Sequence, residues 1–340
     1  MIPMRRLRFR PLAVLAALGT LALTGCGTDT RASGAGTAGP GRTVTAHQFM
    51  RLTTTHQATG MTLLEGPTFG ADGRLNVVDV TAPAGEPKLI RVDVKRKTAR
   101  TLFTDRRGAY TSAQFSPYDG RIYLSDFASG AIVSLAADGT GPRTFFSGEV
   151  DGARMLPDDI AFDRDGHLYV SDSLGMSEGE ARGRVVRVDR DGGKATVLAD
   201  GLAATNGIAF DTDHRGLWIS ELTENRISYL PVVERPGMSG RHTAVRVDGG
   251  IAQTDSIAVD ADGNLYQALH GRPAMEVYSR YGEHLATVRI PGRTEGLESA
   301  TNVAITPGGT KAYMTVSGPA GGYLYTFEAL AKGVRQSNGG

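Results

Sequence analysis

Residues 162–172 read Phe-Asp-Arg-Asp-Gly-His-Leu-Tyr-Val-Ser-Asp. An Asp-Gly pair between an apolar residue and an alternating apolar run predicts a β-hairpin. The pattern recurs at 69–79, 115–126, 210–221, 259–269 and 305–316. Its turn glycines are Gly73, Gly120, Gly166, Gly216, Gly263 and Gly309, which lie 46 to 50 residues apart. The chain therefore contains six copies of one unit.

Each copy is followed by further short apolar segments, which predict a third strand in every copy and a fourth in the first five. Four antiparallel strands in a period of about 47 residues are typical of a propeller blade. We therefore expect an all-β fold, a six-bladed β-propeller with four-stranded antiparallel blades. The sixth copy has no fourth strand of its own, because the chain ends in a polar tail. A strand within residues 46–64 is expected to supply it and close the ring.

The N-terminus has the pattern of an export signal. Four arginines between positions 5 and 10 precede an apolar run at 12–23, which is too short to span a bilayer. The run ends in Leu-Thr-Gly-Cys at 23–26, which resembles the lipobox of bacterial lipoproteins. Residues 1–25 are thus expected to be a lipoprotein signal peptide, and Cys26 to be lipidated. Because Cys26 is the single cysteine, the chain cannot form an internal disulfide.

The remaining sequence divides into three parts. Residues 26–45 comprise the lipidated cysteine and a Gly-, Thr- and Ala-rich stretch that predicts a flexible linker. Residues 46–333 are expected to form the propeller, and 334–340 a polar tail. The protein is then exported, monomeric and held at the cell-envelope membrane through its lipid anchor only. A net charge of +1 without a basic stripe argues against a nucleic-acid partner.

One position of the repeat carries oxygen in every copy. Four residues before the first-strand apolar residue stand Glu65, Thr111, Asp158, Asn206, Asp255 and Thr301. Because the first strand of each blade lines the central channel, these six ring positions should lie at one height around the axis.

Four of the ring positions predict a metal site. Side chains of Glu65, Asp158, Asn206 and Asp255 would offer only oxygen ligands and three negative charges, which suits a hard divalent cation such as Ca²⁺. Mg²⁺, Mn²⁺ and Zn²⁺ remain alternatives. Taken singly, each residue is also compatible with a structural role in a turn or a side-chain-to-backbone bond. Their shared register favours the metal site, because carboxylates facing one another without a cation would repel.

Other polar residues are expected to be structural. Second strands end in Asp79, Asp126, Asp172 and Glu221, which should accept hydrogen bonds from turn backbone. The seven histidines show no metal-ligand spacing. We expect His270, at the end of a second strand, to lie on the surface or rim rather than in the pocket.

Several motifs carry a resemblance to a known family. They are LEG at 64–66, DDIAF at 158–162, NGIA at 206–209, LWISELTENR at 217–226, DS at 255–256, IPGR at 290–293 and LAKG at 330–333. In order and spacing they resemble the family of senescence marker protein, gluconolactonase and luciferin-regenerating enzyme, and within it the drug-responsive lactonase type. The resemblance covers about residues 64–333.

The resemblance implies a role for each residue of the site. A catalytic divalent metal would be held by Glu65, Asp158, Asn206 and Asp255, with a further contact from Ser256, and Asp255 would be the general acid/base. The lactonase type also holds a second, structural calcium just before its paired aspartates. Val150, Ala153 and Met155 occupy the positions of its acidic, threonine and tyrosine ligands, so that site is expected to be absent.

Together these observations predict an exported, calcium-dependent hydrolase that opens a small-molecule lactone, a cyclic ester. The cation would polarise the carbonyl and activate water. One alternative is a non-catalytic propeller that binds a ligand or a partner protein. Another is a lyase acting on a cyclic depsipeptide, although that chemistry favours a channel histidine, which the ring positions lack.

Overall fold

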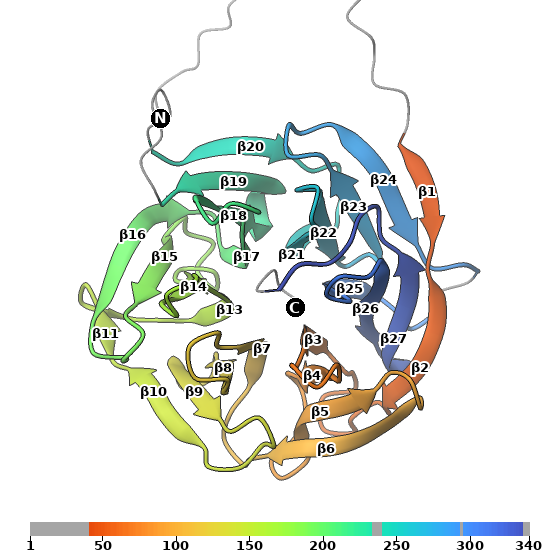
Figure 1. The fold of residues 1–340 in the computed structure, drawn as a ribbon, viewed down its shortest axis with the longest axis horizontal. Helices are drawn as coiled ribbons and strands as arrows, with labels where there is room; N and C mark the ends of the chain where they lie inside the picture. Colours follow the sequence, from red (N-terminus) through yellow and green to blue (C-terminus); the bar gives the residue numbers. More distant parts are fainter. Residues whose placement is uncertain (1–40, 233–239, 293–294, 336–340) are drawn as a thin grey trace, which may run out of the picture. The chain divides into compact units, whose positions relative to one another are not determined.

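The computed structural model describes residues 41–232, 240–292 and 295–335. These residues form an all-β fold in which strands follow one another with short turns (Figure 1). The described ranges contain no α-helix, and their one helical turn is the 3₁₀ segment η1 (Leu222–Glu224). No helix in these ranges has the length and apolar content needed to cross a membrane.

Four repeats form separate four-stranded antiparallel sheets, each with its strands in sequence order. The first comprises β3 (Leu64–Phe69), β4 (Leu75–Asp79), β5 (Pro87–Asp93) and β6 (Thr98–Thr104), and the second β7 (Tyr110–Phe115), β8 (Ile122–Asp126), β9 (Ala131–Leu135) and β10 (Arg143–Ser147). The third comprises β13 (Pro157–Phe162), β14 (Leu168–Asp172), β15 (Gly183–Val188) and β16 (Ala195–Leu202), and the fourth β17 (Thr205–Phe210), β18 (Gly216–Glu221), β19 (Arg226–Pro231) and β20 (His242–Arg246). Between β10 and β13 lies a small ribbon of β11 (Glu149–Val150) and β12 (Ala153–Arg154).

The last two repeats do not form separate sheets. One nine-stranded sheet contains β21 (Gln253–Val259), β22 (Leu265–His270), β23 (Ala274–Tyr278), β24 (His284–Arg289), β25 (Ser299–Ile305), β26 (Lys311–Gly318), β27 (Gly321–Glu328), β1 (Arg42–Thr45) and β2 (His47–Thr53). The two repeats are joined where Leu269 of β22 pairs with Ala300 of β25. The sequence prediction of six separate blades is corrected here: four are separate, because this one pairing merges the strands of the other two.

Two N-terminal strands belong to the nine-stranded sheet. Strand β2 pairs antiparallel with β27 at its outer edge, within the range expected to supply a strand to the last repeat. Strand β1 pairs in parallel with β24. The segment predicted to be a linker therefore includes a strand, Arg42–Thr45, which its short polar sequence does not signal.

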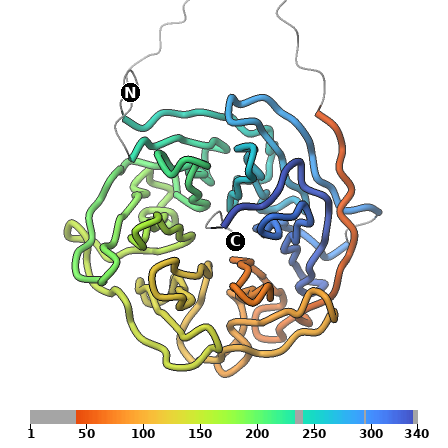
Figure 2. The backbone as a smooth tube through the Cα atoms, in the orientation of Figure 1, coloured from red at the N-terminus to blue at the C-terminus, as the bar shows by residue number. Residues whose placement is uncertain are grey.

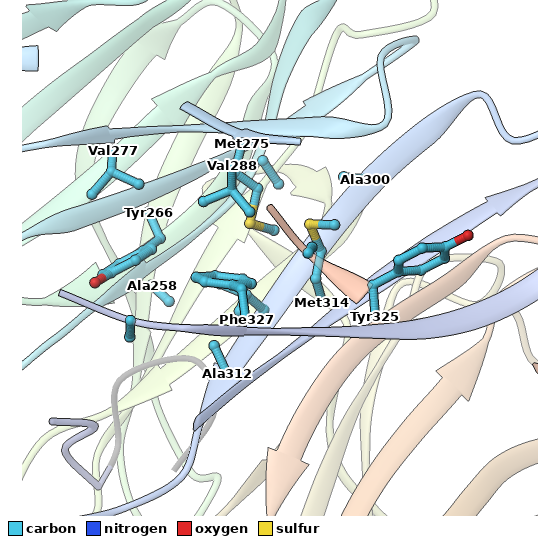
Figure 3. Packing of buried hydrophobic residues seen from close by; sticks show 14 of the residues in the cluster. Ala258, Tyr266, Met275, Val277, Val288, Ala300, Ala312, Met314, Tyr325 and Phe327 are labelled. Atoms are coloured by element: carbon cyan, nitrogen blue, oxygen red, sulfur yellow. The ribbon is translucent and has the colours of Figure 1, made fainter. Parts of the chain in front are cut away.

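The first strands of successive repeats contact one another in turn. Strand β3 contacts β7, β7 contacts β13, β13 contacts β17, β17 contacts β21, and β21 contacts β25, which in turn contacts β3. Figure 2 shows the chain following the same order from repeat to repeat. Apolar side chains fill the space between neighbouring repeats. Figure 3 shows one such cluster, in which Tyr266, Met275, Met314 and Phe327 are buried together.

Glycines let neighbouring first strands approach closely beside the ring positions. A Cβ atom on Gly207 would lie 2.5 Å from the backbone nitrogen of Ile257 on the next first strand. Gly66, after Glu65, has the same relation to Ala113 and adopts a φ of +50°, which favours glycine. The two glycines therefore keep β3 and β17 close to their neighbours.

We expect Gly207→Ala to destabilise the fold by about 1–3 kcal/mol, the usual effect of forcing extra volume into a packed site. Gly309→Ala is the matched control, because a Cβ there would meet its nearest neighbour only at 3.6 Å. Chemical unfolding of both variants measures the difference. Equal stability of the two would contradict the close approach at Gly207.

Candidate metal centre

A bulge in the first strand places each ring residue. The pairing of first and second strands shifts register at Asp158, between Pro157 and Ile160. The same shift occurs at Asn206, Asp255, Thr111 and Thr301, and directly after Glu65. A bulge leaves a residue outside the ladder and re-aims its side chain. The repeat thus builds the same irregularity at one end of every first strand.

Two ring residues are in direct contact. The Asn206 amide donates from Nδ2 to Asp158 Oδ2 at 3.1 Å. The amide oxygen of Asn206 is buried and has no hydrogen-bond partner among the described residues. Glu65, Asn206 and Asp255 are buried, and Asp158 is partly buried. A buried acceptor without a donor is costly, so this oxygen is suited to a ligand.

The carboxylates of Glu65, Asp158 and Asp255 interact electrostatically. Burial raises the pKa of Glu65 well above its ordinary value, and the charges of Asp255, Asp158 and Asp159 raise it further. Burial and the charges of Asp159 and Asp255 likewise raise the pKa of Asp158 well above its usual range. The neighbouring carboxylate charges thus disfavour ionisation of Glu65 and Asp158.

The two ring threonines have a structural role. Thr111 Oγ1 donates to the backbone oxygens of Pro157 and Asp158 at 3.2 and 3.1 Å. Thr301 Oγ1 donates to the backbone oxygen of Leu64 at 2.5 Å. Each hydroxyl therefore ties one first strand to the next and helps to hold the ring together.

Asp255 is held at both of its oxygens. Its Oδ1 accepts the backbone N–H of Ser256 at 3.0 Å, and its Oδ2 lies 3.5 Å from His270 Nδ1. The pKa of Asp255 is raised, because burial outweighs the hydrogen bond and charge of His270, which lower it. Ser256 is buried beside it, and its predicted contact with the cation stays a prediction.

His270 is the site neighbour that the sequence analysis underestimated. Its side chain is 46% exposed, as a rim residue should be, yet its ring reaches Asp255. The signal was present in the register: His270 pairs with Gln253, two residues before Asp255. The end of a second strand lies beside the start of the first, and this neighbour follows from hairpin geometry.

The acidic residues that end the second strands are structural, as predicted. Each accepts a backbone N–H: Asp79 from Thr81, Asp126 from Ala109, Asp172 from Leu156, and Glu221 from Ala203. These bonds fix the loops around the site without entering it.

An arginine of β15 contacts the loop that precedes Asp158. The buried Arg184 guanidinium donates to the backbone oxygens of Val150 and Ala153 at 2.6 and 3.2 Å. It also donates from Nε to Asp172 Oδ2 at 2.6 Å. The Arg184 side chain thus fixes the loop in which Val150 and Ala153 occupy positions of the second-calcium ligands.

The donor set fits a divalent cation in chemistry. Three carboxylates and an amide offer hard oxygen ligands, and the unpaired amide oxygen of Asn206 is available to one. Among the residues that the structure describes, no group of three or more His, Cys, Asp or Glu side chains is close enough to hold a metal ion by itself. Convergence of all four side-chain oxygens on one point therefore stays a prediction.

Comparison with known proteins agrees with this class of fold. Lactonase drp35 of Staphylococcus saprophyticus is 29% identical over 281 residues, which cover 79% of this chain and 84% of that protein. Lactonase drp35 of Staphylococcus aureus strain USA300 is 28% identical with the same coverage. Among solved structures, the calcium-binding protein regucalcin of Agrobacterium tumefaciens is 16% identical with a TM-score of 0.68, covering 87% of this chain and 98% of that one. A gluconolactonase of Xanthomonas campestris is 21% identical with a TM-score of 0.65, covering 86% and 99%.

The fold is thus that of an all-β, propeller-like protein in which three of the first strands carry an acidic residue at one end. The model of the SMP-30/gluconolactonase/LRE-like region matches residues 63–318, so the chain belongs to this family. The resemblance noted in the sequence is confirmed, including its lactonase relatives.

Proposed function

We propose that this protein is an exported, lipid-anchored hydrolase that uses a divalent cation, Ca²⁺ in the first place, to open a lactone ring. The proposal is supported by the equivalent positions of Glu65, Asp158, Asn206 and Asp255 at the ends of their first strands, in a chain whose relatives include lactonases. The metal, the export and the anchor are parts of the proposal.

The proposal includes a complete six-bladed ring. The nine-stranded sheet would act as the fifth and sixth blades, with β2 as the outer strand of the sixth. Two features support this arrangement: in the described residues β22 and β25 pair at Leu269–Ala300 alone, and β25 contacts β3.

The residues of the site have different roles in hydrolysis. When bound, a divalent cation supplies Lewis-acid polarisation of the lactone carbonyl and lowers the pKa of water. Asp255 takes a proton from the attacking water as the new C–O bond forms at the carbonyl carbon. It then gives that proton to the ring oxygen as the ester bond breaks, so that one water is consumed and a hydroxy acid is released. Glu65, Asp158 and Asn206 supply the remaining ligands.

The test is lactone turnover by the purified protein before and after chelation. We expect turnover of gluconolactone or another simple lactone, its loss in chelator, and recovery on addition of excess Ca²⁺. Activity that chelation leaves unchanged would contradict the metal dependence. Calcium binding without turnover of any lactone would favour the non-catalytic alternative, a propeller that binds a ligand or partner.

A lyase remains a second candidate because His270 lies against Asp255. A lyase would break a cyclic depsipeptide by elimination and leave an unsaturated product, whereas hydrolysis adds the oxygen of water. Mass spectrometry of products formed in ¹⁸O-labelled water separates the two. Incorporation of ¹⁸O supports the hydrolase.

The anchor makes a separate prediction. Cys26→Ser should release active protein from the membrane fraction, because stable anchoring needs two or more acyl chains, each contributing about 0.8 kcal/mol per buried CH₂. Fractionation followed by immunoblotting measures it, with unsubstituted protein as the control. Unsubstituted protein found wholly in the soluble fraction would contradict lipidation at Cys26.

A further inference from the structure

The two carboxylate oxygens of Asp255 have different contact partners. Oδ1 is held by the backbone N–H of the adjacent Ser256, a contact that any residue at position 256 except proline would supply. Oδ2 faces the side chain of His270, a residue from another strand. Each carboxylate oxygen has two lone-pair directions, so both contacts leave room for a cation or a substrate.

The two contacts together determine the orientation of the Asp255 carboxylate. Rotation about the bond that carries the carboxylate exchanges or tilts the two oxygens, and a contact at Oδ1 alone restricts this rotation only in part. A second contact at Oδ2 fixes the plane. Ligating carboxylates in metal sites are commonly held in this way by neighbouring hydrogen-bond donors.

His270 is itself placed firmly. It is the last residue of β22, and the preceding Leu269 pairs with Ala300 of β25. The following Gly271 has a φ of +81° and donates its N–H to Ser299 Oγ at 2.9 Å. The strand end is therefore fixed to the next repeat on both sides of the histidine.

We propose that His270 is a positioning residue for Asp255, holding Oδ2 through its Nδ1–H so that the carboxylate presents a fixed orientation to cation and substrate. The contact is 3.5 Å long, and contacts of catalytic groups often tighten when substrate binds. The kinetic effect of this role rests on the proposed function. The contact between His270 and Asp255 does not depend on that function.

Two substitutions of His270 distinguish a contact made by Nδ1 from one made by Nε2. The side-chain nitrogen of asparagine can occupy the place of Nδ1, whereas that of glutamine reaches the place of Nε2. His270→Asn should therefore retain the contact with Asp255, and His270→Gln and His270→Ala should lose it. His284→Asn is the matched control, because His284 also contacts a carboxylate, Glu276 at 2.8 Å, but outside the site.

The experiment measures kcat and KM for a simple lactone at saturating Ca²⁺, calcium affinity by calorimetry, and thermal unfolding for all four variants. We expect His270→Gln and His270→Ala to lower kcat about 10- to 100-fold with little change in KM. Both variants should also weaken calcium binding by a similar factor. His270→Asn should stay close to unsubstituted protein, and His284→Asn should leave kcat unchanged. Similar kcat values for His270→Asn and His270→Gln would overturn the proposal.

A metal-free readout keeps this proposal distinct from the proposed function. In ¹⁵N NMR spectra of metal-free protein, Nδ1 of His270 should carry a proton, and the assignment follows from the signal lost in His270→Asn. An Nδ1 without a proton would overturn the positioning role even if lactones are hydrolysed. A protonated Nδ1 in a protein without lactonase activity would support the contact and reject the proposed function alone.

Discussion

Asp255→Asn is expected to lower kcat for lactone hydrolysis by about 10² to 10⁴, the usual loss when a general acid/base is removed. Asparagine keeps the size of the side chain and one oxygen for a cation, but it cannot carry the proton from water to the leaving oxygen. Asp255 is buried, and each of its two oxygens has a polar neighbour, the Ser256 N–H and His270. Steady-state kinetics across a calcium titration measures the loss.

Asn206→Ala is the matched comparison. It removes a neutral ligand, so it should weaken calcium binding, and excess Ca²⁺ should restore part of the activity. Added Ca²⁺ should not rescue Asp255→Asn. Near-normal turnover of Asp255→Asn at saturating Ca²⁺ would show that Asp255 is a ligand only and that the proton travels by another route.

Arg184→Met is expected to destabilise the protein by about 3–5 kcal/mol, because it leaves the buried Asp172 carboxylate without its partner. The guanidinium is 7% exposed and the carboxylate 0%. The substitution also releases the backbone oxygens of Val150 and Ala153, so that the loop before Asp158 loses its anchor. Chemical unfolding measures the effect.

The control for this prediction lies on the same strand. Arg187 pairs with Asp189 at 2.9 Å, but both side chains are about one third exposed. Arg187→Met should cost no more than about 1 kcal/mol, as exposed ion pairs usually do. An equal loss in the two variants would show that burial of the Arg184 pair is not what stabilises the loop.

The repeat made much of the fold predictable. The six turn glycines, spaced 46 to 50 residues apart, locate first and second strands because hairpin turns and alternation are local signals. The same register brought Glu65, Asp158, Asn206 and Asp255 to one end of the first strands. A single pairing between Leu269 and Ala300, which merges two repeats into one sheet, has no local signal.

Long-range contacts of polar side chains were harder to predict. Arg184 lies 34 residues from Val150, and nothing in its own segment indicates that it binds that loop. The contact of His270 was foreseeable from hairpin register. Its place at the end of a second strand instead favoured a rim role. Strand β1 was missed because Arg42–Thr45 is short and largely exposed, and its order comes from pairing with β24.

A crystal structure of the protein grown with Ca²⁺ tests the central claim most directly. The account predicts one cation with an oxygen each from Glu65, Asp158, Asn206 and Asp255 at about 2.3–2.6 Å. A cation bound elsewhere would contradict it, as would side-chain oxygens of these four residues that stay more than about 8 Å apart, well beyond two ligand distances.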